Sequence, residues 1–247
     1  MLSKAKIKYI QSLQQKKYRQ REGLFLVEGE KIVEEVLHQQ LFKVHSIYAT
    51  DAWVNKNMTF ATQYKAILTS ISPAELKKIS NLKTPNQIVA LVEKAAHAPS
   101  AHQINQSLNL VLENIQDPGN MGTIIRIADW FGIPHIFCSK GCVDIYNSKV
   151  VQATMGSFLR TAVVYTDLDQ LFDEHPLPIY GAVLGGENLF QSQLIEPSFL
   201  LIGNEGKGLS DAIQNRITHR ITIPKTGQAE SLNAAVATGI LCAFFRQ

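Results

Sequence analysis

No run of apolar residues in this chain of 247 residues is long enough to cross a bilayer, so we expect no membrane-spanning helix. The basic start lacks an uninterrupted apolar stretch behind it, and we therefore expect no secretory signal. Only three cysteines are present, Cys138, Cys142 and Cys242, too few and odd in number for a disulfide framework. Because no second cysteine pair or histidine cluster accompanies Cys138 and Cys142, we expect no metal site. We interpret the thiols as buried residues of a cytoplasmic protein.

Acidic residues are missing from the first 21 positions. This segment holds seven basic residues: Lys4, Lys6, Lys8, Lys16, Lys17, Arg19 and Arg21. Since the formal net charge of the chain is +3, residues 22–247 carry a net charge of −4 by difference. Positive charge gathered at one end indicates contact with a polyanion, although a solvated helix face would have the same composition.

The N-terminal part has the pattern of a small α/β domain over residues 1–94. A basic helix is predicted over residues 4–20 and an amphipathic helix over residues 29–39, and a further helix begins at Ser72 and Pro73. Short strands are predicted over residues 24–27, 44–49 and 87–92. Residues 95–107 lack periodicity and contain Pro and small polar residues, which predicts a linker.

Strands and helices alternate in the rest of the chain. Apolar runs predict strands over residues 108–112, 135–138, 162–165, 180–184, 199–202 and 221–223. Helices are predicted over residues 123–131, 148–158, 168–173 and 230–245. This alternation indicates an α/β domain over residues 108–247, with a mostly parallel sheet covered by helices on both faces. Ligands bind beyond the carboxyl ends of such strands, where three polar segments lie: residues 114–126, 201–210 and 221–233.

The first polar segment joins a strand to a helix that we expect to begin near Met121. Asn120 would serve there as a helix cap and Arg126 as a surface charge, or the two would hold a phosphate or ribose. In the second segment, Lys207 is followed by Gly208 rather than Ser or Thr, which excludes a P-loop. Glu205 would repel a pyrophosphate, which argues against a dinucleotide-binding loop.

The third segment places Ser231 and Asn233 before an alanine-rich helix. Either residue would be a good helix cap. No histidine lies near Ser231 in the sequence, so we exclude a serine hydrolase triad.

Together and in this order, the three segments resemble the motifs of the SpoU (TrmH) class of the SPOUT superfamily. Its members are RNA ribose 2′-O-methyltransferases that use S-adenosylmethionine. The matching residues are Asp117-Pro-Gly-Asn-Met-Gly122 with Arg126, then Gly203-Asn-Glu-Gly-Lys-Gly-Leu-Ser210, then Ile223-Pro224 with Ser231-Leu-Asn233. Residues 153–156 are similar to the family's Ala-Ser-Met-Gly segment, but Thr154 replaces Ser.

The N-terminal part resembles the substrate-binding domain of this family, an α/β module akin to ribosomal protein L30e. Residues 18–37 carry that likeness. Residues 84–90 depart from it, because Thr-Pro-Asn-Gln stands where many members have His-Gln-Gly, and this puts in doubt that the RNA contacts are the same.

The resemblance implies a deep trefoil knot in the C-terminal domain and a homodimer. It implies a catalytic set of Asn120, Arg126, Glu205, Ser231 and Asn233. It also implies an S-adenosylmethionine pocket that uses Leu184, Gly203, Ile223 and Leu232. We expect RNA contacts from Lys16, Lys17, Arg19 and Arg21. Because a guanidinium stays protonated in proteins, we expect Arg126 to clamp a phosphate or stabilise alkoxide charge rather than act as a base.

The predicted function is therefore methylation of a ribose 2′-oxygen in RNA, with ribosomal RNA as the first expectation. Transfer RNA is the alternative substrate, and a catalytically inactive RNA-binding member of the fold is the alternative role. An oxidoreductase with an open α/β sheet is disfavoured, because the dinucleotide fingerprint is absent.

Overall fold

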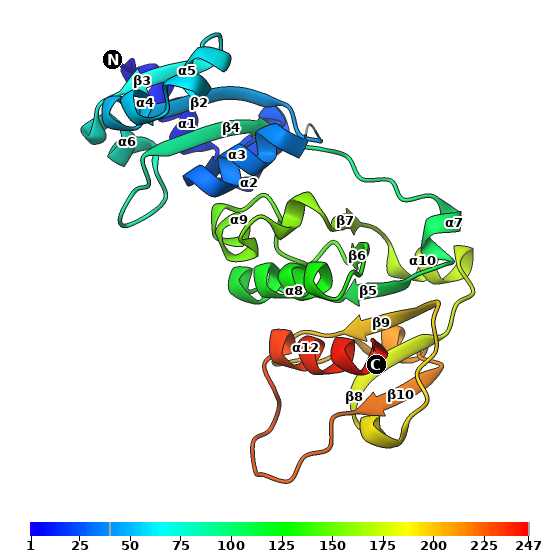
Figure 1. Cartoon of the computed structure of the whole chain (residues 1–247). Helices are drawn as coiled ribbons and strands as arrows, with labels where there is room; N and C mark the ends of the chain where they lie inside the picture. Colours follow the sequence, from blue (N-terminus) through cyan, green and yellow to red (C-terminus); the bar gives the residue numbers. More distant parts are fainter. Residues whose placement is uncertain (40, 247) are drawn as a thin grey trace. The chain divides into compact units, whose positions relative to one another are not determined.

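The computed structural model describes residues 1–39 and 41–246 of the chain. Its contacts divide into two compact units (Figure 1). Unit 1 comprises Met1–Ala96 with Tyr146–Leu159, and unit 2 comprises His97–Ile145 with Arg160–Gln247. Residue 247, the last of the predicted C-terminal domain, lies outside the described residues. Among the described residues, no helix has the length and apolar character that a membrane span requires.

Unit 1 is built on a four-stranded sheet in the order β1-β4-β2-β3. Its strands are β1 (Leu24–Glu28), β2 (Val44–Thr50), β3 (Leu68–Ile71) and β4 (Ile88–Glu93). Strand β4 runs antiparallel to both β1 and β2, whereas β2 and β3 are parallel. The helices are α1 (Lys4–Ser12), α2 (Lys16–Glu22), α3 (Glu30–Gln39), α4 (Asp51–Lys56), α5 (Met58–Gln63) and α6 (Pro73–Ile79). The N-terminal α/β pattern is therefore present, with the strands β1, β2 and β4 where apolar runs predicted them.

The single basic helix predicted over residues 4–20 is wrong, because the chain turns between α1 and α2. Arg19 causes the break: its guanidinium is buried and donates hydrogen bonds to the carbonyls of Leu13 (3.0 Å) and Gln14 (2.7 Å). A guanidinium that satisfies two carbonyls at a helix end stabilises the turn, since buried carbonyls need a donor.

Residues 146–159 lie between two strands of unit 2 in the sequence but pack within unit 1. They form α9 (Ser148–Thr154) and a 3-10 turn, η1 (Ser157–Leu159). The ring of Phe25 meets Tyr146 at 4.5 Å and Phe158 at 6.0 Å between centroids. The helix predicted over residues 148–158 is too long, because Met155 takes a left-handed conformation (φ 52°) that ends α9.

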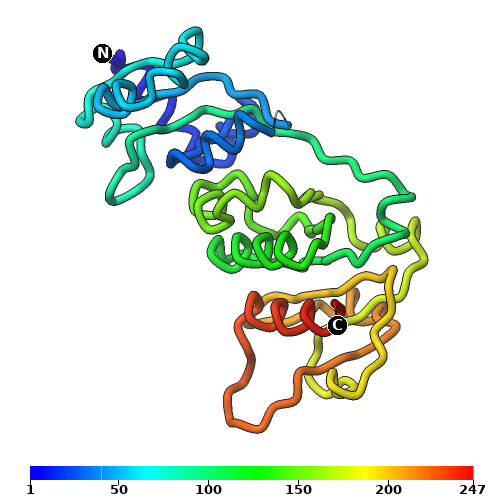
Figure 2. Tube along the Cα trace, in the orientation of Figure 1, coloured from blue at the N-terminus to red at the C-terminus, as the bar shows by residue number. Residues whose placement is uncertain are grey.

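Unit 2 contains, within the described residues, a six-stranded sheet in the order β10-β8-β9-β5-β6-β7. The strands are β5 (Leu108–Leu112), β6 (His135–Cys138), β7 (Ala162–Tyr165), β8 (Ile179–Asn188), β9 (Ser198–Ile202) and β10 (His219–Thr222). Every neighbouring pair is parallel, which confirms the predicted parallel sheet. The tube in Figure 2 follows the chain through this unit from green to red.

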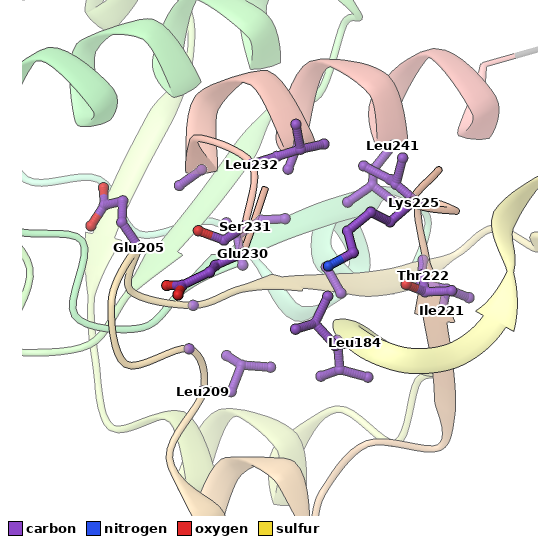
Figure 3. Close-up of a pocket in the computed structure, with 18 of the residues that line it drawn as sticks. Leu184, Glu205, Leu209, Ile221, Thr222, Lys225, Glu230, Ser231, Leu232 and Leu241 are labelled. Carbon is purple, nitrogen blue, oxygen red and sulfur yellow. The ribbon is translucent and has the colours of Figure 1, made fainter. Parts of the chain in front are cut away.

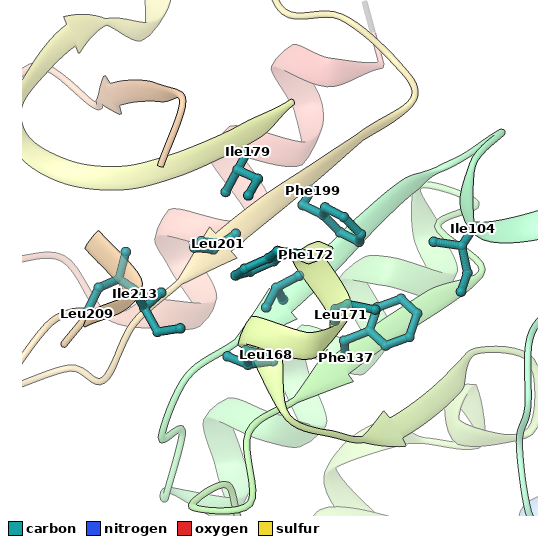
Figure 4. Packing of buried hydrophobic residues seen from close by; sticks show 11 residues of the cluster. Ile104, Phe137, Leu168, Leu171, Phe172, Ile179, Phe199, Leu201, Leu209 and Ile213 are labelled. Atoms are coloured by element: carbon teal, nitrogen blue, oxygen red, sulfur yellow. The ribbon is translucent and has the colours of Figure 1, made fainter. Parts of the chain in front are cut away.

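Helices and turns of unit 2 complete the α/β layers. They are α7 (Ala101–Ile104), α8 (Pro118–Trp130), α10 (Leu168–Glu174), η2 (Leu189–Gln191), α11 (Asp211–Gln214) and α12 (Ala234–Phe245). One apolar cluster joins α10 to the sheet, with the ring of Phe199 packed against Phe137 and Phe172 (Figure 4). Helix α12 packs against α8. The short helix α7 lies inside the stretch expected to be a linker.

Two helix starts differ from the prediction. Helix α8 begins at Pro118, earlier than Met121, because the Asp117 side chain caps it by accepting a hydrogen bond from the Asn120 amide (2.8 Å). Helix α12 begins at Ala234, later than residue 230, because Asn233 is its cap. Of the two alternatives for a cap before α12, Asn233 is therefore confirmed and Ser231 is wrong.

Strand β8 contains an excursion that shapes one wall of a cavity. It pairs with β10 through Tyr180 and Gly181 and again through Glu187 and Asn188, so residues 182–186 leave the ladder. Leu184 sits on this excursion and is 75% exposed, which is unusual for a leucine inside a strand.

The three cysteines are free thiols and all are buried, which confirms the predicted burial. Burial raises the pKa of Cys138 well above its usual value and that of Cys242 to about 12. A hydrogen bond from Cys138 lowers the pKa of Cys142 to about 7, despite the opposing effect of burial. No cluster of three or more metal-ligating side chains occurs among residues 1–39 and 41–246.

Candidate active site

A cavity of about 810 Å³ opens in unit 2 beyond the carboxyl ends of β8, β9 and β10 (Figure 3). The excursion of β8, the loop after β9 and the loop between β10 and α12 form its walls. The four residues predicted to bind a cofactor all line it: Leu184, Gly203, Ile223 and Leu232. Glu205 and Ser231 from the predicted catalytic set line it as well. The position matches the general location of ligand sites in parallel sheets.

The loop after β9 is closed on itself at its base. The backbones of Asn204 and Gly208 exchange two hydrogen bonds, of 3.1 and 2.8 Å. The Asn204 side chain accepts from the amides of Gly206 (3.0 Å) and Lys207 (3.1 Å). A methyl group on Gly203 would come within 2.5 Å of the Gly208 carbonyl carbon, closer than real atoms approach. This close backbone contact requires glycine at position 203.

Two residues that the sequence analysis missed hold this loop against the end of β5. The carboxylate of Glu113 is buried and accepts hydrogen bonds from the amide (2.8 Å) and hydroxyl (2.6 Å) of Ser210. The side-chain nitrogen of Asn204 donates a hydrogen bond to the carbonyl of Asn114 (2.9 Å). Glu113 and Asn114 directly follow a buried strand, and the position of Glu113 alone could have indicated that its carboxylate needs a hydrogen-bond partner.

Three predicted catalytic residues from three separate segments are joined by side-chain hydrogen bonds. The Asn233 oxygen accepts from the amides of Ala235 (3.0 Å) and Val236 (3.2 Å) at the start of α12. The Asn233 side-chain nitrogen then donates to the Asn120 oxygen (2.9 Å), and the Asn120 nitrogen donates to one oxygen of Glu205. We call Asn233, Asn120 and Glu205 the amide chain.

The helix fixes the direction of the amide chain. A backbone N–H can only donate, so the oxygen of Asn233 must face α12 and its NH₂ group must face Asn120. Asn120 is oriented in turn, with its oxygen toward Asn233 and its NH₂ group toward Glu205. Glu205 is therefore placed as an acceptor at the cavity, and its second oxygen has no hydrogen-bond partner in the described part of the chain.

Arg126 does not join the amide chain. It lies on α8 six residues after Asn120, which places it about 120° away around the helix. Its side chain is exposed and makes no hydrogen bond or ion pair within the described residues. Ser231 is also exposed and has no side-chain hydrogen bond there. The structure thus joins three of the five predicted catalytic residues, places Ser231 on the cavity wall and leaves Arg126 free to meet a ligand.

The residues predicted to bind RNA lie on α2 of unit 1, but they differ in exposure. Lys16, Lys17 and Arg21 are exposed. Arg19 is only 2% exposed and its guanidinium is engaged in the turn between α1 and α2. Arg19 therefore does not lie at the surface as expected, because its hydrogen bonds stabilise the turn between the two helices.

Comparison with known proteins identifies the family. The model of the SpoU rRNA methylase family matches residues 107–243, and that of the MRM3-like substrate-binding domain matches residues 4–90. The chain belongs to the SpoU rRNA methylase family, and the resemblance stated from its motifs is confirmed.

Several relatives match over nearly the whole chain. The 23S rRNA (guanosine(2553)-2′-O)-methyltransferase RlmP of Bacillus subtilis is 31% identical, with 96% of this chain and 94% of that protein covered. A putative TrmH-family RNA methyltransferase from Porphyromonas gingivalis has a TM-score of 0.87 at 37% identity, covering 100% of this chain and 98% of that one. An AdoMet-bound rRNA methyltransferase from Sinorhizobium meliloti has a TM-score of 0.88 at 26% identity, covering 100% and 95%.

The contact at Gly203 predicts a difference between two glycines of one loop. Gly203→Ala should lower the free energy of unfolding by about 1–3 kcal/mol, because the added methyl group meets backbone that cannot move aside. Gly206→Ala is the matched control, since its nearest non-neighbouring atom would lie 3.8 Å away, and it should change stability by less than about 0.5 kcal/mol. Urea denaturation measures both variants, and equal midpoints would show that the close contact does not constrain the loop.

Proposed function

We propose that this chain transfers a methyl group from S-adenosylmethionine to a ribose 2′-oxygen of ribosomal RNA. The observation that carries the proposal is the amide chain, which places one oriented carboxylate on the wall of a cavity at the strand ends. The names of the relatives support the substrate, since RlmP is a 23S rRNA 2′-O-methyltransferase. The AdoMet-bound rRNA methyltransferase from Sinorhizobium meliloti supports the donor.

The cavity suits a nucleoside that has one apolar end and one charged end. Its volume of about 810 Å³ lies in the usual range for such ligands. Leu184 and Leu232 are 75% and 47% exposed on its wall, and we assign them to apolar contact with the adenine. Backbone groups near Gly203 and Ile223 are assigned to hydrogen bonds with the nucleoside, because both residues line the cavity.

The donor supplies a methyl group already activated on a sulfonium, which passes to the ribose oxygen as the carbon–sulfur bond breaks and the carbon–oxygen bond forms. The protein therefore has to align the two reactants and accept the hydroxyl proton. We assign that proton to the unpaired oxygen of Glu205, since the other oxygen is held by Asn120. A carboxylate has a free lone pair that can accept the proton in the transfer step, whereas the guanidinium of Arg126 is already protonated and has no acceptor.

Arg126 is assigned to the RNA backbone. Its exposed guanidinium has no partner in the described residues, and a planar fork of donors matches a phosphate. A clamp on the phosphate beside the target ribose would align the hydroxyl with the donor. Ser231, on the cavity wall, is assigned to a hydrogen bond with the same nucleotide.

Removing the guanidinium should separate catalysis from donor binding. Arg126→Ala should lower the methylation rate by at least about 100-fold, because alignment of the acceptor is lost. Its affinity for S-adenosylmethionine should stay near that of the wild type. Transfer of labelled methyl to ribosomal RNA measures the first quantity, and calorimetric titration of the donor measures the second.

Thr123→Ala is the control for this comparison, because Thr123 is another exposed residue of α8 and it should retain activity. Near-normal turnover by Arg126→Ala would contradict the assignment. A wild-type chain that binds no donor would instead favour the inactive RNA-binding alternative.

We also propose that the chain acts as a homodimer through α8 and α12 of unit 2. Trp130 is 84% exposed on α8 and Val236 is 52% exposed on α12, and these two helices pack together. Exposed apolar side chains on adjoining helices favour a contact with a second apolar surface. A second copy fits because α8 and α12 also carry Asn120 and Asn233, so dimerisation would place the partner near the site.

A charge on this surface should disrupt the dimer. Trp130→Glu should shift the mass measured by light scattering after gel filtration from two chains toward one, since a dry interface cannot hold an unpaired carboxylate. Leu41→Glu, at a residue 51% exposed in unit 1, is the matched control and should leave the mass unchanged. A wild type that elutes as one chain would overturn this part of the proposal.

The remaining predictions are retained as proposals. Lys16, Lys17 and Arg21 are kept as RNA contacts, and Arg19 is removed from that set because it is buried. Residues 1–94 and 108–247 are kept as the substrate-binding and catalytic domains, with the trefoil knot in the latter. A cytoplasmic location fits an enzyme that acts on ribosomal RNA. Ribosomal RNA is favoured over transfer RNA because RlmP matches nearly the whole chain.

A further inference from the structure

The burial of Arg19 decides which side chains α2 presents to solvent. Successive residues of a helix are about 100° apart, so Lys17 and Arg21 lie within about 40° of each other and Tyr18 within about 100° of Lys17. Arg19 lies about 200° from Lys17, on the opposite side. Because its guanidinium is anchored to the carbonyls of Leu13 and Gln14, Lys17 and Arg21 must be on the outer face, with Tyr18 half-buried beside them.

Both outer cations lie against the ring of Tyr18. The Lys17 ammonium is 4.8 Å from the ring centroid and the Arg21 guanidinium is 5.0 Å from it. Both distances are within the range of a cation–π contact. No hydrogen bond to the Tyr18 hydroxyl occurs among the described residues, so the fold does not use this hydroxyl as a polar anchor.

The charged residues near Tyr18 in the sequence are basic, with the exception of Glu22. Glu22 follows it, but this carboxylate is engaged by Arg21 at 2.7 Å and by the Tyr9 hydroxyl at 3.4 Å. Lys16 is exposed but lies about 160° from Tyr18 around the helix, and no acidic residue precedes Tyr18 in the chain. The ion pair with Glu22 offsets the charge of Arg21, so the net positive charge at the ring comes from Lys17. An aromatic ring with a net positive charge suits a ligand that is both flat and anionic.

We propose that Tyr18, Lys17 and Arg21 form a binding site for one unpaired nucleotide of RNA. The base stacks on the Tyr18 ring, and the ammonium and guanidinium move from the ring to the flanking phosphates. The inference rests on the proposed function only in taking RNA as the ligand. It adds that unit 1 recognises a single-stranded or bulged nucleotide rather than the regular backbone of a helix.

A stacking site and a merely basic surface differ in what they bind. Bases inside a duplex are covered by their neighbours, so an aromatic ring gains nothing from double-stranded RNA. Phosphates are available in both forms, so Lys17 and Arg21 would contact either. The ring of Tyr18 therefore distinguishes single strands from duplexes, and the cations do not.

The test uses the full chain with fluorescently labelled oligouridine and with a duplex RNA of equal length. Tyr18→Ala should weaken binding of the single strand by roughly 5- to 150-fold, the usual cost of one lost base–aromatic stack, and leave duplex binding unchanged. Tyr18→Phe keeps the ring and should bind as the wild type does. Lys17→Ala with Arg21→Ala should weaken both ligands and reduce the salt dependence of binding.

Equal loss of single-strand and duplex binding by Tyr18→Ala, or no loss, would overturn the proposal and leave a basic surface without a stacking site. Thermal unfolding of Tyr18→Ala and Tyr18→Phe serves as a check, and matching midpoints show that the fold is intact. If the midpoints differ, Tyr18→Leu replaces the alanine variant, since it keeps apolar volume without a stacking face. Donor titration of the wild type tests the proposed methyl transfer separately, because α2 lies outside the cavity.

Discussion

The hydrogen bonds from the start of α12 to Asn233 determine the polar geometry of the whole site. Two backbone amides hold the Asn233 oxygen, so its nitrogen must donate to Asn120, and Asn120 must then donate to Glu205. A helix end always leaves amides that need acceptors, and here that need orients a carboxylate two side chains away. Asn233 and Asn120 can each adopt only one orientation of the side-chain amide, and together they keep Glu205 as a hydrogen-bond acceptor.

This orientation is useful only if the loop that carries Glu205 stays in place. The loop closes through the backbone contact at Gly203, which excludes any larger residue, and it is tied to the end of β5 through Glu113 and Ser210. Glu113 is buried and accepts two hydrogen bonds, so its charge is compensated without facing the cavity. The carboxylate of Glu113 thus stabilises the loop, and that of Glu205 is available for chemistry.

The sequence predicted the parallel sheet well, because runs such as those of β5 and β9 are apolar throughout and buried on both faces. It could not predict the break between α1 and α2, since a buried Arg19 has the same sequence signature as an exposed one. The amide chain was equally hidden: Asn120 and Asn233 are 113 residues apart, and only the fold makes them neighbours. The candidate site residues came from the family motifs, and residue chemistry alone gave caps and turns.

Replacement of Asn233 by Asp tests most directly whether the amide chain orients Glu205. Aspartate caps a helix about as well as asparagine, so Asn233→Asp should change the free energy of unfolding by less than about 0.5 kcal/mol. It cannot donate to Asn120, and Asn120 would turn its oxygen toward Glu205. The account predicts that methylation falls by about 100-fold or more at saturating donor and RNA. Wild-type turnover in a stably folded Asn233→Asp variant would show that the site works without the chain.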